Sequence, residues 1–318
     1  MFQDMKEIDC IFCNKKSDEI VITENNYSCK RCSQCGLIFL SPRPTHEEIR
    51  NIYKTDHDNI SAADRIASEF IKIFNTKHHI KLIRKFVKHG ALLEIGPGGG
   101  QFLSEAKENG FDPYAIELNP KQAQFINNER KIPCEDQELT SDSFPSKMFD
   151  VIYHSDVLSH FYDPMSEFKK MNSKLKMNGY LIFETGILNE VEKKHFNLIP
   201  SFQLPSHLFF FSDRSIQHLL KRTGFSLIKI FKYSRVFQLR AINMINKVKG
   251  KKIYNGKNKI DHFNKSATIP HSKHSNILRT SLKKMYHYSL HFSRYNIGYI
   301  LPKKHVPVTA IIVAKKVS

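Results

Sequence analysis

Residues 92–100 read Leu92-Leu93-Glu94-Ile95-Gly96-Pro97-Gly98-Gly99-Gly100, an apolar strand that runs into a turn with four glycines in five positions. The following residues, 101–106, have helical spacing, and a second strand, 113–117, ends on Glu117. Glycine lets backbone approach a bound molecule where a Cβ would collide, and an acid at the end of the second strand can accept hydrogen bonds from a ribose. We therefore expect a ligand that contains a nucleoside against this turn.

The spacing of the glycines narrows the choice of ligand. The turn reads E-x-G-x-G-x-G, headed by Glu94, whereas the dinucleotide fingerprint is G-x-G-x-x-G. A glycine-rich loop alone is weak support, but here the loop, its strand and the downstream acid occur in the order that a site needs. The pattern resembles the S-adenosylmethionine (SAM) site of class I methyltransferases. The resemblance implies SAM contacts at Glu94, Gly96, Gly98, Gly100, Glu117, Leu118, Asp136 and His154.

The resemblance extends over about residues 80–232. Residues 149–154, 157–164 and 175–183 look like the fourth strand of that family, its following loop and the fifth strand, and residues 207–212 and 219–225 continue toward the sixth. It implies an α/β, Rossmann-like fold with a seven-stranded, mostly parallel sheet, in which Val306–Ala314 inserts antiparallel between the fifth and sixth strands.

The apolar pattern supports this fold independently. Strands are predicted at 91–95, 113–117, 132–134, 149–154, 179–185 and 225–232, and helices at 100–110, 120–130, 164–176 and 213–223. Strands that alternate with helices form a mostly parallel sheet with helices on both faces. We divide the chain into a small metal-binding module (1–44), a helical lead-in (45–90), a SAM-binding core (91–235), a basic insertion with one amphipathic helix (236–303) and a final strand (304–318).

The first module is predicted from its cysteines. Five of the six cysteines lie within residues 10–35, and two pairs, Cys10-x2-Cys13 and Cys32-x2-Cys35, have the spacing of a tetrahedral Zn²⁺ site. Cys29 offers an alternative pair with Cys32. We choose Cys35 because Gly36 follows it, as Asn14 follows Cys13, and both residue types tolerate the left-handed backbone that turns amides toward a thiolate. Four thiolates leave no open coordination position, so the predicted zinc is structural.

A zinc ribbon before a SAM domain adds a second resemblance. The ribbon ends in Gly36-Leu37-Ile38-Phe39-Leu40-Ser41-Pro42-Arg43-Pro44. This arrangement resembles a bacterial subgroup of methyltransferases that includes sugar C-methyltransferases and enzymes encoded beside surface-polysaccharide genes. It implies a small-molecule acceptor that is a saccharide or a lipid- or nucleotide-linked intermediate.

Charge is distributed unevenly along the chain. The formal net charge is +18, and residues 231–318 contain 19 Lys and Arg but one acid, Asp261. Such a segment suits a sugar nucleotide or an anionic membrane surface, with nucleic acid as the second choice, unless it is only a solvated basic face. The N-terminus has no apolar signal core, so we expect a cytoplasmic protein that can associate peripherally with the inner membrane surface.

Histidines are the candidate catalytic residues. A methyl sulfonium is already an activated electrophile, so the protein has to align a nucleophile and, for an oxygen or carbon nucleophile, remove a proton. His154 and His160 flank the end of the fourth strand, and His207 matches a family position near the substrate cleft. These three are the candidate general bases, with Glu184 at the end of the fifth strand as a further candidate.

The sequence lacks a motif of base-methylating enzymes and leaves two alternative functions open. The fourth strand ends in Tyr153-His154-Ser155-Asp156, not in the Asn/Asp-Pro-Pro-aromatic motif of enzymes that methylate exocyclic base amines. An RNA methyltransferase that uses the basic segment for phosphate contacts remains the alternative enzyme. A non-catalytic SAM-fold binding module is a third hypothesis, which the complete glycine turn with Glu117 argues against.

Overall fold

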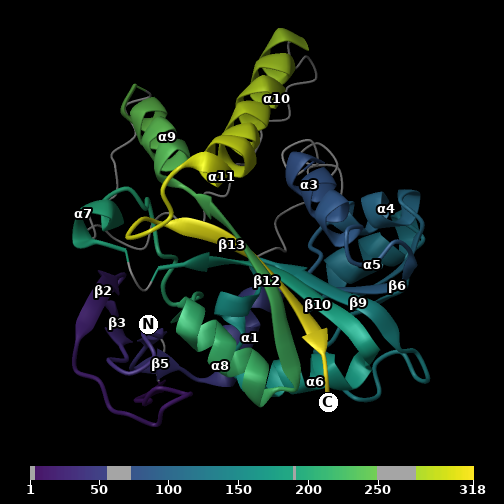
Figure 1. Cartoon of the computed structure of the whole chain (residues 1–318), viewed down its shortest axis with the longest axis horizontal. Coiled ribbons are helices and arrows are strands. Elements are labelled where there is room, and N and C mark those ends of the chain that lie inside the picture. The colour runs from purple at the N-terminus through teal and green to yellow at the C-terminus, as the bar shows by residue number, and fades with distance from the viewer. Residues whose placement is uncertain (1–3, 56–72, 189–190, 249–276) are drawn as a thin grey trace.

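The computed structural model describes residues 4–55, 73–188, 191–248 and 277–318 (Figure 1). A seven-stranded sheet in the order β12-β13-β10-β9-β6-β7-β8 forms its centre. β13 is antiparallel to β10 and β12, and the other pairs are parallel. The fold is the predicted Rossmann-like one, with the last strand between the fifth and sixth. The strands are β6 (Gly90–Ile95), β7 (Phe111–Ile116), β8 (Cys134–Glu135), β9 (Phe149–Ser155), β10 (Leu175–Ile187), β12 (Phe225–Ser234) and β13 (Val308–Lys316).

Helices cover both faces of the sheet, as Figure 1 shows. On one face, α3 (Ile73–Ile83), α4 (Gln101–Glu108) and α5 (Pro120–Glu129) bury a cluster that includes Ile80, Leu103 and Ile126. On the other, α6 (Pro164–Lys174) and α8 (Asp213–Arg222) bury a second cluster that includes Phe168 and Leu219. Two apolar faces on one parallel sheet explain why its strands are apolar on both sides.

Polar caps fix where these helices begin. Asn119 accepts a hydrogen bond from Gln122 N at 3.0 Å and starts α5 before Pro120. Asp163 accepts from Ser166 N at 3.1 Å and starts α6 before Pro164. Ser212 and Ser215 form a reciprocal capping box at the start of α8. Side-chain oxygens thus satisfy amides that a helix leaves unpaired in its first turn. Residues 56–72 of the helical lead-in and residues 249–276 of the basic insertion lie outside the described residues.

The N-terminal module is joined to the core by a shared sheet. Its strands are β1 (Met5–Lys6), β2 (Ile20–Glu24), β3 (Tyr27–Arg31), β4 (Ile38–Leu40) and β5 (Arg43–Pro44). β11 (Phe209–Phe210), which follows β10 and the short helix α7 (Lys193–Phe196), pairs with β4 and completes a four-stranded sheet β11-β4-β3-β2. The buried residues of the module belong to the same cluster as those under α6 and α8. Residues 4–44 therefore pack as part of one body with the core.

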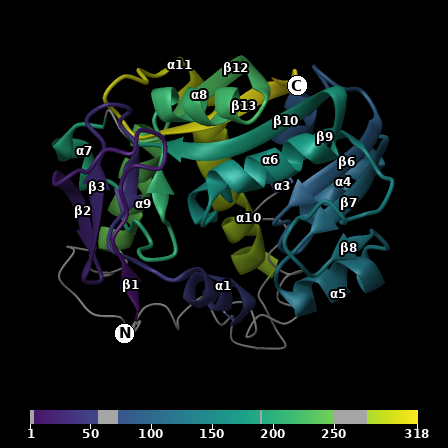
Figure 2. The same cartoon turned by 90° about the horizontal axis from the view of Figure 1, so that it is seen from below.

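Two further segments surround the carboxyl end of the sheet. α1 (His46–Thr55) leaves the module and runs toward β8 and α5 (Figure 2). After β12, α9 (Val236–Val248) projects from the body, as does α10 (Ile277–Phe292), which continues into η3 (Ser293–Ile297) and α11 (Gly298–Ile300) (Figure 1). α10 was predicted, whereas α9 was not. Within the described ranges, none of the helices is both long and apolar enough to cross a bilayer.

Candidate functional site

The glycine turn requires a backbone that only glycine adopts easily. Gly96, Gly98 and Gly100 have φ of 69°, 58° and 71°, in the left-handed region that disfavours residues with a Cβ. A Cβ on Gly96 would also lie 2.9 Å from Val157 Cγ2, in the loop after β9. The turn therefore presents bare backbone at the carboxyl end of β6, where ligands bind in parallel sheets.

Glu117 closes the other side of this turn. Its Oε2 accepts a hydrogen bond from Gly98 N at 3.0 Å, and its Oε1 accepts one from Asn119 N at 3.0 Å. Glu117 as a whole is only 8% exposed. The two backbone donors hold its carboxylate in a defined orientation between β6 and β7.

A pocket of about 440 Å³ opens beside the turn and Glu117. This is an ordinary size for the site of a small molecule or cofactor. The turn and the ends of β6 and β7 form one wall, and the loop after β9 forms another. α1 covers the pocket from outside. Predicted residues among its lining are Gly96, Gly98, Glu117, Leu118 and His160, and unpredicted ones include Ile49, Arg50, Tyr53, Gln137, Glu138 and Asp156.

His160 lies in this lining, and its hydrogen bonds fix its tautomer. Its Nδ1 is 2.5 Å from the Tyr53 hydroxyl and 3.1 Å from Ser206 O, while the hydroxyl donates to the same carbonyl at 2.6 Å. The hydroxyl has one proton, which it gives to Ser206 O, and a carbonyl can only accept. Nδ1 must therefore carry a proton. In the neutral ring, Nε2 then has the lone pair, which is the state that a general base requires.

His207 packs against His160 but is not among the pocket-lining residues. The two ring centroids are 4.6 Å apart, and Phe210 packs on the other side of His207 at 5.8 Å. Burial, reinforced by the neighbouring His160, lowers the pKa of His207 to about 3. A neutral His207 supports the ring of His160 without repelling a proton taken up there.

The structure does not bring His154 into the pocket. Its side chain is fully buried under α6, stacked on Phe183 at 5.0 Å and near Phe168 at 6.0 Å. Neither ring nitrogen has a hydrogen-bond partner among the described residues. Burial lowers its pKa to about 3. His154 therefore occupies the place of an aromatic core residue.

Three other predicted residues lie around the pocket without lining it. Glu94 is buried in β6, and Gly100 is the residue before α4. Asp136 follows β8 and is exposed, while the next two residues, Gln137 and Glu138, line the pocket.

Asp156 is a pocket residue that the sequence analysis did not single out. It follows β9 directly and has a φ of 56°, a backbone conformation that is uncommon outside glycine and concentrates at functional sites. Asp156 is exposed to solvent in the pocket, but desolvation by the surrounding protein atoms, together with the nearby Glu184 carboxylate, still raises the pKa of its carboxyl. The sequence feature that could have identified Asp156 is a polar residue directly after an apolar strand.

Glu184 itself is fully buried and fully engaged. Its carboxylate accepts hydrogen bonds from Ser155 Oγ at 2.8 Å and from the Tyr295 hydroxyl at 3.0 Å. His79 Nε2 lies 3.7 Å away, and the Tyr295 hydroxyl is 3.0 Å from the same nitrogen. Glu184 thus links β10 to α3 and η3 at the carboxyl edge of the sheet.

The N-terminal module contacts the loop that carries His160, both before and after this residue in the sequence. Leu40 N donates to Leu208 O at 2.9 Å, and Leu208 N donates to Ser159 O at 2.8 Å. Beyond His160, Arg43 Nη1 donates to Tyr162 O at 3.0 Å, and its guanidinium lies 3.8 Å from the centre of the Tyr162 ring. α1, which directly follows the module, supplies Tyr53. Hence the module positions His160 through its neighbours on both sides and through its hydrogen-bond partner.

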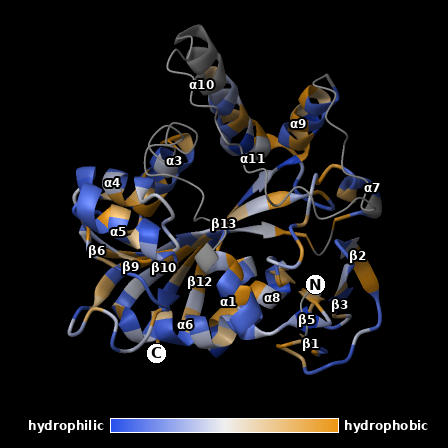
Figure 3. Ribbon diagram, turned by 180° about the vertical axis from the view of Figure 1, so that it is seen from behind, coloured by the Kyte–Doolittle hydropathy of each residue, from blue (hydrophilic) through white to orange (hydrophobic). Residues whose placement is uncertain are grey.

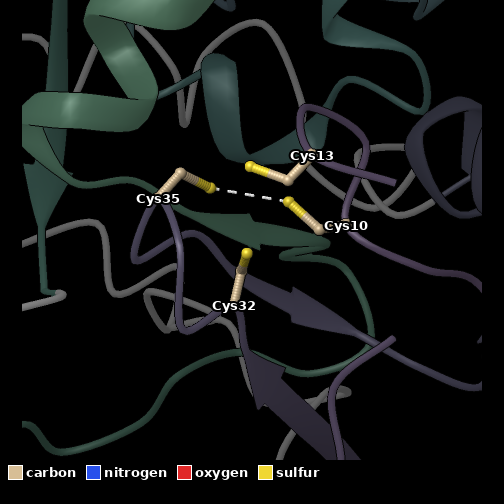
Figure 4. Close-up of side chains that lie close together, drawn as sticks. All are labelled: Cys10, Cys13, Cys32 and Cys35. Carbon is tan, nitrogen blue, oxygen red and sulfur yellow. Dashed lines mark hydrogen bonds between the residues drawn. The ribbon is translucent and has the colours of Figure 1, made fainter. Parts of the chain in front are cut away.

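Four cysteines converge at the tip of the module (Figure 4). The Sγ atoms of Cys10, Cys13, Cys32 and Cys35 all lie within 4.8 Å of one another. A tetrahedral zinc ion with Zn–S bonds of about 2.3 Å separates its sulfurs by about 3.8 Å, so the cluster fits this metal. Asn14 and Gly36 have the predicted positive φ. Cys29 lies in β3, outside the cluster.

Comparisons with known proteins agree with this geometry. A family model described as a methyltransferase domain matches residues 68–230. A tRNA U34 carboxymethyltransferase of Nautilia profundicola is 29% identical over 183 residues, which cover 55% of this chain and 56% of that protein. Phosphoethanolamine N-methyltransferase 1 of Zea mays is 32% identical over 121 residues, 36% of this chain and 23% of that protein. The chain thus spans about half or less of the length of these two relatives.

A solved structure shows the same fold. Phosphoethanolamine N-methyltransferase 2 of Haemonchus contortus, in complex with phosphomonomethylethanolamine and S-adenosylhomocysteine, has a TM-score of 0.50 at 16% identity. The alignment covers 88% of this chain and 63% of that one.

Proposed function

Because this chain belongs to the methyltransferase domain family, we propose that it is a SAM-dependent enzyme that methylates a small molecule, a saccharide or a lipid- or nucleotide-linked intermediate. One observation carries the proposal: a single pocket joins the glycine turn and Glu117 to His160. The volume of the pocket, and its cover by α1, suit a small acceptor that is enclosed during the reaction.

SAM occupies the side of the pocket next to the turn in this proposal. Gly96 and Gly98 let the backbone contact the cofactor, and Leu118 packs beside it. Glu117, oriented by two backbone amides, accepts hydrogen bonds from the ribose hydroxyls. Bound SAM supplies a methyl group on a positively charged sulfur, which leaves as a neutral thioether.

His160 acts on the acceptor side as the general base. The nucleophilic oxygen or carbon forms its bond to the methyl group and releases its proton to Nε2 of His160. The Tyr53 hydroxyl and Ser206 O stabilise the resulting imidazolium through Nδ1–H. Asp156, which lies near His160 in the pocket lining, hydrogen-bonds to an acceptor hydroxyl and orients it.

The four-cysteine cluster binds one structural zinc ion. The metal ties the loop of Cys10 and Cys13 to the loop between β3 and β4. β4 in turn pairs with β11 and contacts Leu208. Zinc therefore supplies rigidity to the module that holds His160, and takes no part in methyl transfer.

A second candidate function is RNA methylation. The relative from Nautilia profundicola bears the name of a tRNA-modifying enzyme, and residues 231–318 carry the whole net positive charge of the chain. Such an enzyme would bind tRNA with an affinity that falls steeply with salt concentration.

Transfer of tritium from [methyl-³H]SAM tests both candidates. The enzyme is incubated in parallel with a mixture of nucleotide sugars and with unmodified tRNA at physiological salt. We expect label in the small-molecule fraction, lowered about 10²- to 10⁴-fold by His160→Gln. His89→Gln, at an exposed position before β6, is the matched control and should keep wild-type activity. Label confined to tRNA would contradict the small-molecule acceptor and support the second candidate.

A further inference from the structure

The outer face of α9 carries apolar and basic side chains in one line. Its exposed residues are Phe237, Arg240, Met244 and Lys247. Steps of three and four residues place them on one side of a helix. Gln238 and Leu239, on the opposite side, are buried against the body.

The outer face of α10, η3 and α11 repeats this arrangement. Met285, Phe292 and Ile300 are each between 47% and 79% exposed, and steps of seven and eight residues place them on one side. His291, Tyr295 and Gly298 are buried on the inner side, where the Tyr288 ring also contacts Phe74 of α3 at 4.4 Å between centroids. We call Met285, Phe292 and Ile300, together with the four residues on α9, the two-helix face.

This face reverses the usual pattern of a surface helix. α8, for comparison, exposes Lys221 and Arg222 and buries Ile216 and Leu219, as expected for a helix on the core of a water-soluble domain. Of the large exposed apolar residues in the described part of the chain, five lie on the two-helix face: Phe237, Met244, Met285, Phe292 and Ile300. Apolar surface gathered on projecting elements marks an interaction site. Figure 3 shows that hydrophobic residues occur along α9, which projects from the body.

Charge identifies the partner. Residues 231–318 contain a single acid, Asp261, and Arg240, Lys247 and Lys304 are exposed beside the apolar residues. Two such basic surfaces repel each other, which disfavours a second copy of this chain. Methionine and isoleucine side chains cannot stack on bases, which disfavours RNA. Apolar and basic groups on one helix face are the composition of a segment that lies in the interface of an anionic membrane.

We propose that the two-helix face binds an anionic lipid bilayer, with Phe237, Met244, Phe292 and Ile300 inserted among the lipids. The inference goes beyond the proposed methyl transfer, but the geometry connects the two. β12 runs parallel to β10, since both are antiparallel to β13. α9 therefore leaves the sheet at the same edge as Ser155 and Glu184, beside the pocket. Binding through the two-helix face would place the pocket close to a lipid-linked acceptor.

Flotation of the full chain with vesicles tests the proposal. Vesicles of phosphatidylcholine with about a quarter phosphatidylglycerol are compared with pure phosphatidylcholine at low and high salt. We expect binding to the anionic vesicles alone, weakened by salt. Phe237→Ser with Met244→Ser should weaken it about tenfold or more, because two inserted groups are lost. Met148→Ser with Ile228→Ser, exposed apolar residues outside the face, is the matched control and should bind normally.

A fluorescent reporter gives an independent reading. The chain has no tryptophan, so Phe237→Trp introduces a single one on the face. Its emission should shift to shorter wavelength with anionic vesicles. SAM affinity should be unchanged in every variant, which separates failure of this proposal from failure of the proposed function.

Three results would overturn the proposal. The first is equal loss of vesicle binding in the face and control variants, or no binding at all. The second is tRNA binding that depends on Phe237 and Met244 while vesicles bind weakly, which would make the face a nucleic-acid surface. The third is a stable dimer in sedimentation that the same double substitution dissociates.

Discussion

Replacing Tyr53 by phenylalanine tests how His160 is prepared for proton transfer. The substitution keeps the ring, whose centroid is 5.1 Å from that of His160, and removes only the hydroxyl. His160 Nδ1 loses its contact at 2.5 Å and retains Ser206 O at 3.1 Å. The imidazole should therefore keep one longer hydrogen bond and lose part of its orientation.

The expected size of this effect is modest. Loss of one hydrogen bond between neutral groups costs about 1 kcal/mol net. If the loss of this hydrogen bond raises the activation free energy of methyl transfer by that amount, the reaction should slow by about fivefold. This is far less than the roughly 10²- to 10⁴-fold expected when the base itself is removed. SAM affinity should stay unchanged, because the hydroxyl contacts His160 and Ser206 and not the glycine turn.

Nitrogen NMR of the ring gives a measurement that needs no acceptor. Long-range ¹H–¹⁵N correlation distinguishes a protonated Nδ1 from a protonated Nε2. Wild-type His160 should be in the Nδ1–H form, and Tyr53→Phe should increase the Nε2–H population. Tyr114→Phe, which loses a hydroxyl contact with Lys147 away from the pocket, is the control. An Nε2–H tautomer in the wild-type protein would refute the reasoning.

Three further substitutions test the module, the core and the metal. Arg43→Gln should lower kcat several-fold and leave SAM affinity unchanged, because it releases Tyr162 O and the loop that carries His160; an unchanged kcat would mean that the contact only supports packing. His154→Phe should make the protein less sensitive to acid. Burial depresses the pKa of His154 from 6.5 to about 3, so between these pH values the unfolded chain binds a proton that the folded protein does not. The free energy of unfolding is therefore undiminished above pH 6.5 and falls as the pH drops toward 3. Urea unfolding at pH 7 and pH 4 should show a smaller decline in the free energy of unfolding for this variant than for wild type, and an equal decline would contradict the assignment. Metal analysis should find about one zinc per wild-type chain, loss of zinc in Cys35→Ser and retention in Cys29→Ser; the reverse pattern would exchange the roles of these two cysteines.

The core sheet could be predicted because its signals are local. Each central strand is an apolar run bounded by glycine, proline or polar residues, and each helix is amphipathic over its own length. Boundaries were less accurate where the backbone is irregular. β10 begins at Leu175, four residues before the prediction, through a bulge in which Asn178 has a φ of 66°. No pattern of apolar residues announces such a bulge.

Long-range pairings could not be predicted in the same way. Phe209 pairs with Phe39 across 170 positions of sequence, and neither strand alone indicates its partner. The contribution of Tyr53 depends equally on where α1 docks. The glycines and Glu117 were predicted because their spacing is set by one local turn and the strand after it.

The burial of His154 could have been predicted from the alternation of side chains along β9. Side chains alternate between the two faces of a strand. Tyr153 stacks on Phe102 of α4, at 3.9 Å between centroids, whereas His154 packs on Phe168 of α6. Proximity to the strand end suggested a site residue, but the alternation places this side chain under α6.

Calorimetric titration with SAM tests whether the cofactor binds between the glycine turn and Glu117. Gly98→Val forces a branched side chain onto a φ of 58°, and Glu117→Ala removes the proposed ribose partner. Each variant should remain folded and bind SAM roughly tenfold or more weakly, as expected when a charged hydrogen-bond acceptor or the backbone contact surface is lost. Glu108→Ala, at an exposed position of α4, should bind like wild type. Wild-type SAM affinity in both folded variants would contradict the account.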